Sequence, residues 1–550
     1  MLLIYFEYTT SMRNKYDVAI IGGGISGLTL GALLGKFGFS CCIVEKETHP
    51  GGYLAGFKRK DFFFDTAIHW LNQFNEEGIA HRCFSFIDEN YPKPVSLQKI
   101  QRYKTDDFNI LVSDDIESVK ADFIKYFPEE EKGIRKFFGH VNELAHASHK
   151  LANFARSAQT MTVFDKALFY TRALPAVFPL IKHLKYTGDK GVKKGLAKYF
   201  KNNEIKDIFS SESDLLSCLF PLAWAKNGDY YSTPAGGSIA FIKWLSEINT
   251  GLNNDIFLNA KVTSILTRKN RAEGIEFIKN NRKGTLLSKY VVIASDLITA
   301  YREMLPAGTI PEKKIKIIED SVQYKSGFTV SAALDCPAEE LGFGEELILL
   351  FKNNLEREKH EEADPFFSKL NVLAPSVRDK SVCPEDKGIV SIYMNADFEK
   401  YEFWQTKTDE SGNRIQGEAY HKLKNDIAQK MIQRVDREIN PEFSKHILFY
   451  EVATPITYHR YTGNYKGTIM GAKPGKENMK NKVDSYLTPV ENLLTGGQWA
   501  ELGGGVPITS KAAMNTTLII LRNENKSAFK LFAAYFDGKK SLSEIKKLIQ

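Results

Sequence analysis

Near its start, the chain alternates between short apolar runs and a glycine turn, in the order that makes a strand, a helix and a second strand. Residues 16–21 form an apolar, β-rich run, and the glycine turn at 22–24 follows at once. Apolar residues then recur with helical spacing over 28–37, and a second β-rich run occupies 40–44. This order predicts a βαβ unit that binds a dinucleotide.

Each of three glycines in this unit has a structural role in binding a dinucleotide. Gly22 allows the tight turn, Gly24 lets the main chain approach a pyrophosphate, and Gly27 lets the helix pack closely against the strand. The unpaired N–H groups at the positive helix end then bind the pyrophosphate. Glu45 follows the second strand, where its carboxylate can accept hydrogen bonds from ribose hydroxyls and would repel a 2′-phosphate. This argues against NADP in the site.

Beyond the βαβ unit the hydrophobic pattern changes several times. The pattern predicts an aromatic hairpin at 57–64, two long charged helices at 116–127 and 130–154, and an amphipathic helix at 239–248. It also predicts several β segments within 256–294 and a last core helix at 508–522.

Six motifs, in order along the chain, resemble the FAD-dependent phytoene desaturase, carotenoid isomerase and retinol saturase family. They are the βαβ unit, the Gly51-Gly52 loop, the helix entry at 231–245, the strand start at 260–262, the block at 454–463 and the Thr-Gly-Gly-Gln-Trp segment at 495–499. The resemblance extends from about residue 15 to 525. It implies an α/β fold of the amine oxidase type, in which a Rossmann-type FAD-binding domain is interleaved with an α+β substrate domain.

The resemblance also implies domain boundaries. A discontinuous FAD-binding domain is expected at 14–90, 225–300 and 481–525, with a substrate and membrane-facing domain at 91–224 and 301–480. A helical tail is expected at 526–550.

Cofactor-binding positions follow from the same resemblance. They are Gly22, Gly24, Ile25, Ser26 and Gly27 at the pyrophosphate, Glu45 and Lys46 at the ribose, Gly52, Tyr53 and Leu54 at the ribityl chain and flavin edge, Val262 at the adenine, and Gly497, Gln498 and Val506 at the flavin pyrimidine. A helix starting at Val506-Pro507 presents oriented N–H groups and a positive dipole, which favour the negative charge near N1 of reduced flavin. Gln498 stands where many members have an acidic residue, and Ala67 where the family usually has glycine.

His69 is the candidate for a catalytic side chain, because its loop is expected to face the flavin. Two interpretations stay open, a role in proton transfer or a packed histidine in a reaction that needs no protein base. Glu143, His146 and His149 share one helical face, but no second Glu-x-x-His motif accompanies them, so a solvated face is favoured and no metal is predicted. No Gly-x-Ser-x-Gly elbow supports hydrolase chemistry.

Composition excludes several other classes of protein. Hydrophobic residues make up 43% of the 550 and charged residues 26%, which excludes a disordered chain. No uncharged apolar stretch approaches the roughly 18 residues of a transmembrane helix. The first ten residues lack the features of a signal peptide. Six cysteines without metal-ligand spacing predict buried thiols and a cytoplasmic location.

The positive charge is concentrated in one segment. Residues 161–203 contain eight Lys and one Arg against two Asp, which equals the net charge of +7 of the whole chain. A nucleic-acid-binding face would not be confined in this way, so no nucleic-acid partner is predicted. Apolar residues alternate with the basic ones, and Pro175 and Pro179 are expected to interrupt the helix. Peripheral membrane contact is the favoured interpretation, and an apolar cover over the substrate cavity is the other.

The predicted function is that of an FAD-dependent oxidoreductase acting on carbon–carbon bonds of a lipophilic polyene, such as a carotenoid, retinoid or other isoprenoid. Desaturation, saturation and cis-trans isomerisation all stay open. The alternatives are a flavin amine oxidase, a non-redox isomerase that uses reduced FAD, and a flavin-free lipid-binding or scaffold protein. The expected location is cytoplasmic with peripheral membrane contact, and the oligomeric state is left open.

Overall fold

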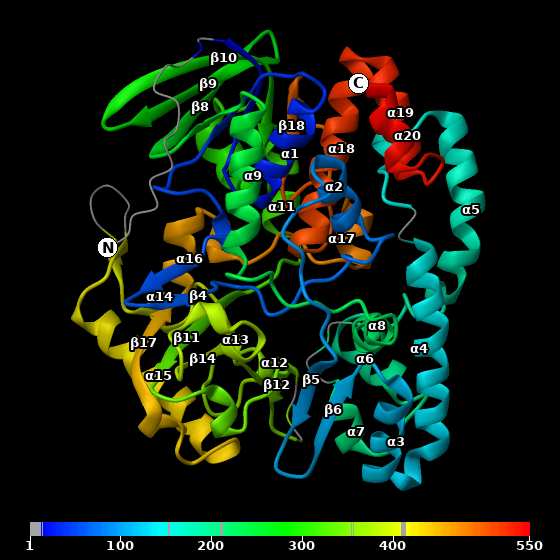
Figure 1. Cartoon of the computed structure of the whole chain (residues 1–550), viewed down its shortest axis with the longest axis vertical. Helices are drawn as coiled ribbons and strands as arrows, with labels where there is room; N and C mark the ends of the chain where they lie inside the picture. The colour runs from blue at the N-terminus through cyan, green and yellow to red at the C-terminus, as the bar shows by residue number, and fades with distance from the viewer. Residues whose placement is uncertain are drawn as a thin grey trace.

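The computed structural model describes residues 13, 15–151, 154–209, 212, 214–353, 355, 357–408 and 414–549. Within them the chain builds two large mixed sheets, which occupy the upper and lower halves of Figure 1. The first ten residues, which are predicted not to form a signal peptide, lie outside this description.

The first sheet contains the dinucleotide-binding unit. Its strands are β1 (Lys15–Ile21), β2 (Cys41–Val44), β7 (Asp255–Phe257), β8 (Ala260–Arg268), β9 (Arg271–Lys279), β10 (Arg282–Ile293) and β18 (Leu493–Thr495). The order is β7-β2-β1-β10-β9-β8, and β18 pairs with β10. Because β1 runs parallel to β2 and β10, their carboxyl ends meet at one edge. The predicted βαβ order is confirmed.

Four helices pack together beside this sheet. They are α1 (Ile25–Gly35), α2 (Ile79–Ile87), α9 (Ile239–Gly251) and α18 (Gly505–Glu524). Helix α1 contacts both α9 and α18, and it is apolar on all sides because it is buried on all sides. Chain segments from both ends of the sequence therefore share one core.

The second sheet collects strands from two distant parts of the sequence. In order across the sheet they are β17 (Ile447–Ala453), β11 (Ser326–Leu334), β14 (Gly388–Ala396), β13 (Leu370–Leu373), β12 (Leu347–Leu350), β5 (Lys99–Lys104) and β6 (Asn109–Ser113). Helix α15 (Glu418–Glu438) contributes buried residues to the core of this sheet. The predicted domain boundaries themselves stay a prediction.

A mostly helical region follows β6. Its helices are α3 (Ile116–Tyr126), α4 (Glu131–Leu151), α5 (Val163–Ile181), α6 (Gly188–Leu196), α7 (Asn203–Asp207) and α8 (Leu215–Lys226). Helices α4 and α5 lie along the right edge of the molecule in Figure 1. None of the helices among the described residues is both long and apolar enough to cross a bilayer.

The prediction that prolines interrupt the helix of segment 161–203 was wrong. Helix α5 continues through both Pro175 and Pro179. Each proline removes a single main-chain N–H group, and because the two are four residues apart, both lie on one side of the helix. The hydrogen bonds on the other sides are kept, so the helix continues.

The remaining helices and strands are short or lie near the chain's end. They are β3 (Phe57–Arg59), β4 (Phe62–Phe64), α10 (Leu297–Thr299), α11 (Glu312–Glu319), α12 (Arg357–His360), α13 (Pro375–Arg378), α14 (Tyr401–Trp404), β15 (Lys407–Thr408), β16 (Arg414–Ile415), α16 (Pro455–Thr462), α17 (Lys476–Asn481), α19 (Lys526–Phe536) and α20 (Leu542–Ile549). The aromatic hairpin is β3–β4, and α19 and α20 lie within the segment 526–549.

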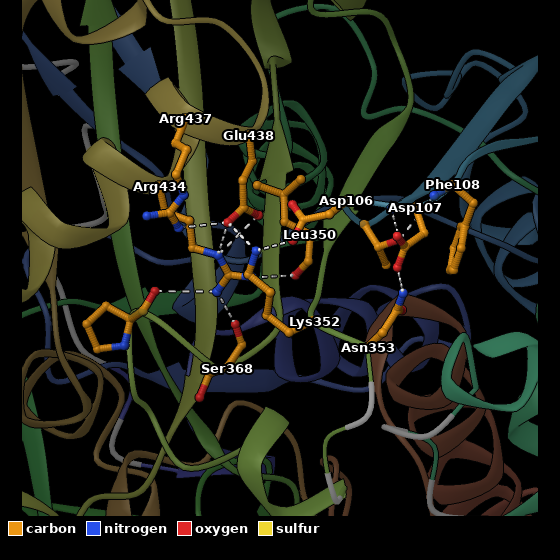
Figure 2. Close-up of polar contacts among 12 residues, drawn as sticks. Asp106, Asp107, Phe108, Leu350, Lys352, Asn353, Ser368, Arg434, Arg437 and Glu438 are labelled. Atoms are coloured by element: carbon orange, nitrogen blue, oxygen red, sulfur yellow. Dashed lines mark hydrogen bonds and ion pairs between the residues drawn. The ribbon is translucent and has the colours of Figure 1, made fainter. Parts of the chain in front are cut away.

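A buried ion network fastens α15 to neighbouring loops (Figure 2). The guanidinium of Arg434 is almost fully buried, and it donates to Glu438 at 3.1 Å and to the carbonyl of Ser368 at 2.5 Å. Lys352 pairs with the same Glu438 at 3.2 Å and with Asp106 at 3.0 Å. The network therefore connects α15 with the turn between β5 and β6 and with the segments around β12 and β13.

Candidate functional site

A cavity of about 2330 Å³ is lined by both sheets. At one end it meets the glycine turn between β1 and α1, the end of β2 and the start of α18. Farther along, one face of the second sheet and aromatic side chains from α8 and neighbouring loops line it. The cavity thus joins the predicted dinucleotide site to a mostly apolar chamber.

The start of α1 has the properties of a phosphate site. Gly24 precedes the helix, no side chain caps its first N–H groups, and no acidic residue stands in the first turn. A Cβ atom built at Gly24 would meet no atom within 4 Å, so this main chain is open to a ligand. The N–H of Gly51 donates to the carbonyl of Gly23 at 2.8 Å, which holds the Gly51-Gly52 loop against the turn. The donors and positive helix end suit a pyrophosphate.

Glu45 lies at the ribose end, buried beside the glycine turn. Its carboxylate accepts the N–H of Gly23 at 2.8 Å and the N–H of Glu47 at 3.0 Å. Two oxygens with about four lone pairs still leave acceptor capacity for a ribose hydroxyl. Lys46 also lines the cavity, and its ammonium pairs with Glu47 at 2.6 Å and donates to the carbonyl of Arg460 at 2.8 Å.

A second uncapped helix start opens onto the same cavity. Helix α18 follows Gly504 without a side-chain cap or an acidic residue in its first turn, and Val506 lines the cavity there. A Cβ atom at Gly504 would lie 1.8 Å from the sulfur of Met470, so a larger residue at this start would have to displace the Met470 side chain. Gln498 lines the cavity beside it. The positive end of a 20-residue helix favours negative charge at this position.

Two tyrosines stand between the glycine loop and the second sheet. The hydroxyl of Tyr53 donates to the carbonyl of Thr468 at 2.7 Å, and its ring centroid lies 6.0 Å from that of Tyr458. The Tyr458 hydroxyl lies 2.7 Å from the hydroxyl of Thr329 and donates to the carbonyl of Thr66 at 3.2 Å. Burial raises the pKa of both phenols, that of Tyr458 to about 12, so both stay neutral at neutral pH.

Comparisons with known proteins bear on this geometry. The chain is 24% identical to the all-trans-retinol 13,14-reductase of Danio rerio, over 94% of this chain and 88% of that protein. It is 22% identical to prolycopene isomerase 2 of an Oncidium hybrid, over 84% of this chain and 76% of that protein. The chain is also 22% identical to a 4,4'-diapophytoene desaturase of a Methylomonas species, over 70% of this chain and 74% of that protein. The resemblance stated from the sequence is confirmed.

Two further comparisons agree with the fold. Residues 20–87 match the NAD(P)-binding Rossmann-like domain family. A putrescine oxidase variant superposes with a TM-score of 0.59 at 13% identity, covering 92% of this chain and 99% of that one. The predicted Rossmann-type fold of the amine oxidase kind is therefore confirmed, and a site for a dinucleotide-type cofactor agrees with it.

Most of the positions that the family resemblance assigned to the cofactor line the cavity. The exceptions are Gly27 and Gly497, which are packed against main chain. A Cβ atom at Gly27 would lie 2.1 Å from the carbonyl oxygen of Gly22, and one at Gly497 would lie 3.1 Å from that of Ala294. Both glycines therefore shape the site through close packing, and the assignment of ligand contacts stays a prediction.

Ser26 lines the cavity, but its hydroxyl is engaged elsewhere. It donates to the carbonyl of Gly496 and lies 3.2 Å from the carbonyl of Thr509, in the first turns of α18. The Ser26 side chain therefore links the start of α1 to the start of α18. The group of Ser26 that can bind a phosphate is its main-chain N–H.

Asp296 is a cavity residue that sequence reasoning missed. It follows the carboxyl end of β10, accepts the N–H of Thr299 at 2.8 Å and accepts the indole N–H of Trp499 at 3.2 Å. Burial raises the pKa of its carboxyl. The signal available in the sequence was its place directly after an apolar strand, since ligands gather at the carboxyl ends of parallel strands.

His69 lies in the cavity wall between the two sheets. Its ring centroid lies 5.3 Å from that of Tyr393, and its carbonyl accepts a hydrogen bond from the guanidinium of Arg378. Burial, reinforced by Arg378, lowers the pKa of His69 to about 4. The ring is therefore neutral at neutral pH and can hydrogen-bond, but it carries no proton to donate as an imidazolium.

This lowered pKa gives a prediction for the pH dependence. Because unfolded His69 takes up a proton near pH 6.5 and folded His69 near pH 4, its contribution to stability is complete above pH 6.5 and falls as the pH drops toward 4. We expect His69→Gln to lose less stability than wild type between pH 6.5 and 4.5 in urea unfolding. We also expect the rate profile between pH 5.5 and 8 to keep its shape in this variant. An inflection near pH 6.5 that vanishes with His69→Gln would contradict the assignment.

Two histidine-containing clusters bear on the expectation that no metal is bound. Glu143 pairs with Lys182 at 2.5 Å, and the side chain of His149 lies outside the described part. The ligand atoms of Asp335, Cys336 and His446 lie within 4.8 Å of one another at the surface, where His446 Nδ1 lies 2.7 Å from a carboxylate oxygen of Asp335.

Proposed function

We propose that the protein is an FAD-dependent oxidoreductase that acts on carbon–carbon bonds of a lipophilic polyene, such as a carotenoid, a retinoid or another isoprenoid. The observation that carries the proposal is the cavity itself, which connects two uncapped helix starts to a long aromatic chamber. The relationship to a retinol reductase and a prolycopene isomerase supports the substrate class.

The residues present fit FAD. The main chain at Gly24 and the start of α1 would hold the pyrophosphate, Glu45 a ribose, and the edge strand β8 at Val262 the adenine. The isoalloxazine would lie between Tyr53 and the start of α18 at Val506. When bound, FAD supplies hydride-transfer chemistry. The protein orients the substrate, excludes water with its aromatic walls, and stabilises negative charge at the positive end of α18.

Expression in a carotenoid-producing host, followed by mass spectrometry of the lipids, tests the reaction. Desaturation removes two hydrogens from a polyene, saturation adds two, and isomerisation changes only its retention time. We expect one of these changes with wild type and none with a variant that cannot hold FAD. An unchanged lipid profile, together with release of peroxide from amines, would favour the amine oxidase alternative, which the likeness to putrescine oxidase keeps open.

We further propose that α5 contacts the membrane. Tyr170, Leu174, Phe178 and Ile181 recur at helical spacing on one face of α5, and their side chains are 48 to 71% exposed. Lysines follow at the carboxyl end of the helix. An exposed apolar face beside basic residues suits a bilayer interface that contains anionic lipid. Ile181 and Leu184 also line the cavity, so this face would lead a lipophilic substrate to it.

Flotation with liposomes of phosphatidylcholine and phosphatidylglycerol tests the contact. We expect the double variant Leu174→Glu and Phe178→Glu to reduce the floating fraction about tenfold, because negative charges would replace the apolar side chains that enter the bilayer. Leu448→Glu, at a side chain 51% exposed on β17, is the matched control and should float like wild type. Equal flotation of the α5 variant and the control would contradict membrane contact through α5.

The proposed location is the cytoplasm with peripheral attachment to a membrane. All six cysteines are unpaired thiols, which suits a reducing compartment.

A further inference from the structure

The part of the cavity away from the glycine turn contains a pair of opposite charges among aromatic side chains. The carboxylate of Glu212 and the ammonium of Lys369 lie 3.8 Å apart, and both residues line the cavity. Tyr103, Tyr324 and Phe351 line it with them. Glu212 lies between α7 and α8, and Lys369 directly precedes β13. The pair therefore connects the helical region to the second sheet.

Both side chains of this pair line the cavity and keep part of their surface accessible. The Glu212 side chain keeps 35% of its surface accessible and that of Lys369 keeps 21%. Burial nevertheless raises the pKa of the Glu212 carboxyl, as expected for a group deep within the protein. A molecule in the cavity can therefore reach both groups.

A substrate made only of hydrocarbon would fit this pair poorly. On entering, it would displace the water that solvates the carboxylate and the ammonium, and it offers no hydrogen bond in exchange. Burying charged groups without such compensation is costly. A polar group on the substrate would restore the lost hydrogen bonds.

The charges around the pair indicate which polar group fits. Asp214 and Glu361 raise the pKa of the Glu212 carboxyl, and Lys369 and Lys473 lower it. Charges of both signs therefore surround the pair, and a neutral polar group adds no further charge to be compensated. A hydroxyl both donates and accepts. It can therefore donate to Glu212 and accept from Lys369, across a gap too long for a direct hydrogen bond between the two.

The pair is set apart from His69 along the same sheet. Lys369 and Asn371 are two residues apart and both line the cavity, Asn371 pairs with Tyr393 on the neighbouring strand, and the Tyr393 ring packs against His69. A substrate group bound at Lys369 is therefore separated from His69 by Asn371 and Tyr393 along the second sheet.

We propose that Glu212 and Lys369 form a subsite that binds a hydroxyl group at one end of the polyene or isoprenoid substrate. The inference rests on the proposed function and narrows it. Oxygenated polyenes are the preferred substrates, and the pair holds them in one direction in the cavity.

Binding of two probes to the FAD-loaded protein tests the subsite. The probes are all-trans-retinol and the hydrocarbon in which a methyl group replaces its hydroxymethyl group, followed by quenching of tryptophan fluorescence. We expect wild type to bind the alcohol at least about tenfold more tightly, since a site built for a hydroxyl rejects the analogue that lacks it. In Lys369→Met and in Glu212→Met the preference should fall to within about twofold.

Lys424→Met is the matched control, because Lys424 lines the same cavity from α15. It should keep the preference for the alcohol. Equal binding of both probes by wild type, binding of neither, or an undiminished preference in both subsite variants would overturn the subsite. Retention of the FAD absorbance shows that a variant is folded. A wild-type protein that stays colourless after incubation with FAD would overturn the proposed function instead.

Discussion

Gly24→Ala is expected to fold like wild type and to lose most of its affinity for FAD. The main chain at Gly24 has φ −73° and ψ 178°, which alanine adopts without strain, and an added Cβ atom would meet nothing within 4 Å. In the complex, however, the methyl group would occupy the space through which the pyrophosphate approaches the main chain. We expect the dissociation constant for FAD to rise at least about tenfold, measured by fluorescence titration, with an unchanged unfolding midpoint.

Gly139→Ala is the matched control for this prediction. Gly139 is an exposed residue within α4, and its added Cβ atom would also meet nothing within 4 Å. Replacing a helical glycine should raise the free energy of unfolding by about 0.5–1 kcal/mol and leave FAD binding unchanged. Wild-type affinity in Gly24→Ala, or an equal loss of affinity in both variants, would contradict the placement of the pyrophosphate at α1.

Arg434→Met is expected to destabilise the protein by about 1–3 kcal/mol, the usual cost of leaving buried acceptors without their donor. The substitution removes the buried donor to Glu438, which keeps Lys352 and Arg437 as partners, and it leaves the carbonyl of Ser368 without this donor (Figure 2). Urea unfolding followed by fluorescence measures the change. Because Arg434 lies outside the cavity lining, FAD affinity per folded molecule should be unchanged.

Lys422→Met on the same helix separates this effect from a general loss of charge. Lys422 pairs with Asp426 at 2.8 Å, but the lysine side chain is 76% exposed. An exposed pair four residues apart contributes about 0.3–0.5 kcal/mol at most. A loss in Arg434→Met as small as that in Lys422→Met would show that the buried network does not hold α15 in place.

The dinucleotide-binding unit could be predicted because its signals are local. Strand, turn and helix follow one another within residues 16–37, and the alternation of apolar residues and glycines determines each of them. Glu45 could be placed for the same reason, since it ends the adjacent strand. The fold class also followed from this unit, because parallel strands joined by helices require a layered α/β arrangement.

The parts that could not be predicted depend on contacts between distant residues. Ser26 was assigned to the phosphate loop, yet its hydroxyl bonds to Gly496, which no local pattern indicates. Glu212 and Lys369 are each an ordinary charged residue in the sequence, and only the assembly of α8 against the second sheet brings them together. The prolines of α5 have a strong local signal, but two removed N–H groups on one side were too few to end the helix.

The most direct test of the account is the absorption spectrum of the purified protein after incubation with FAD and removal of free cofactor. The account predicts a retained visible flavin band, a stoichiometry of one FAD per chain, and loss of the band in Gly24→Ala. A folded protein that remains colourless in excess FAD would contradict it.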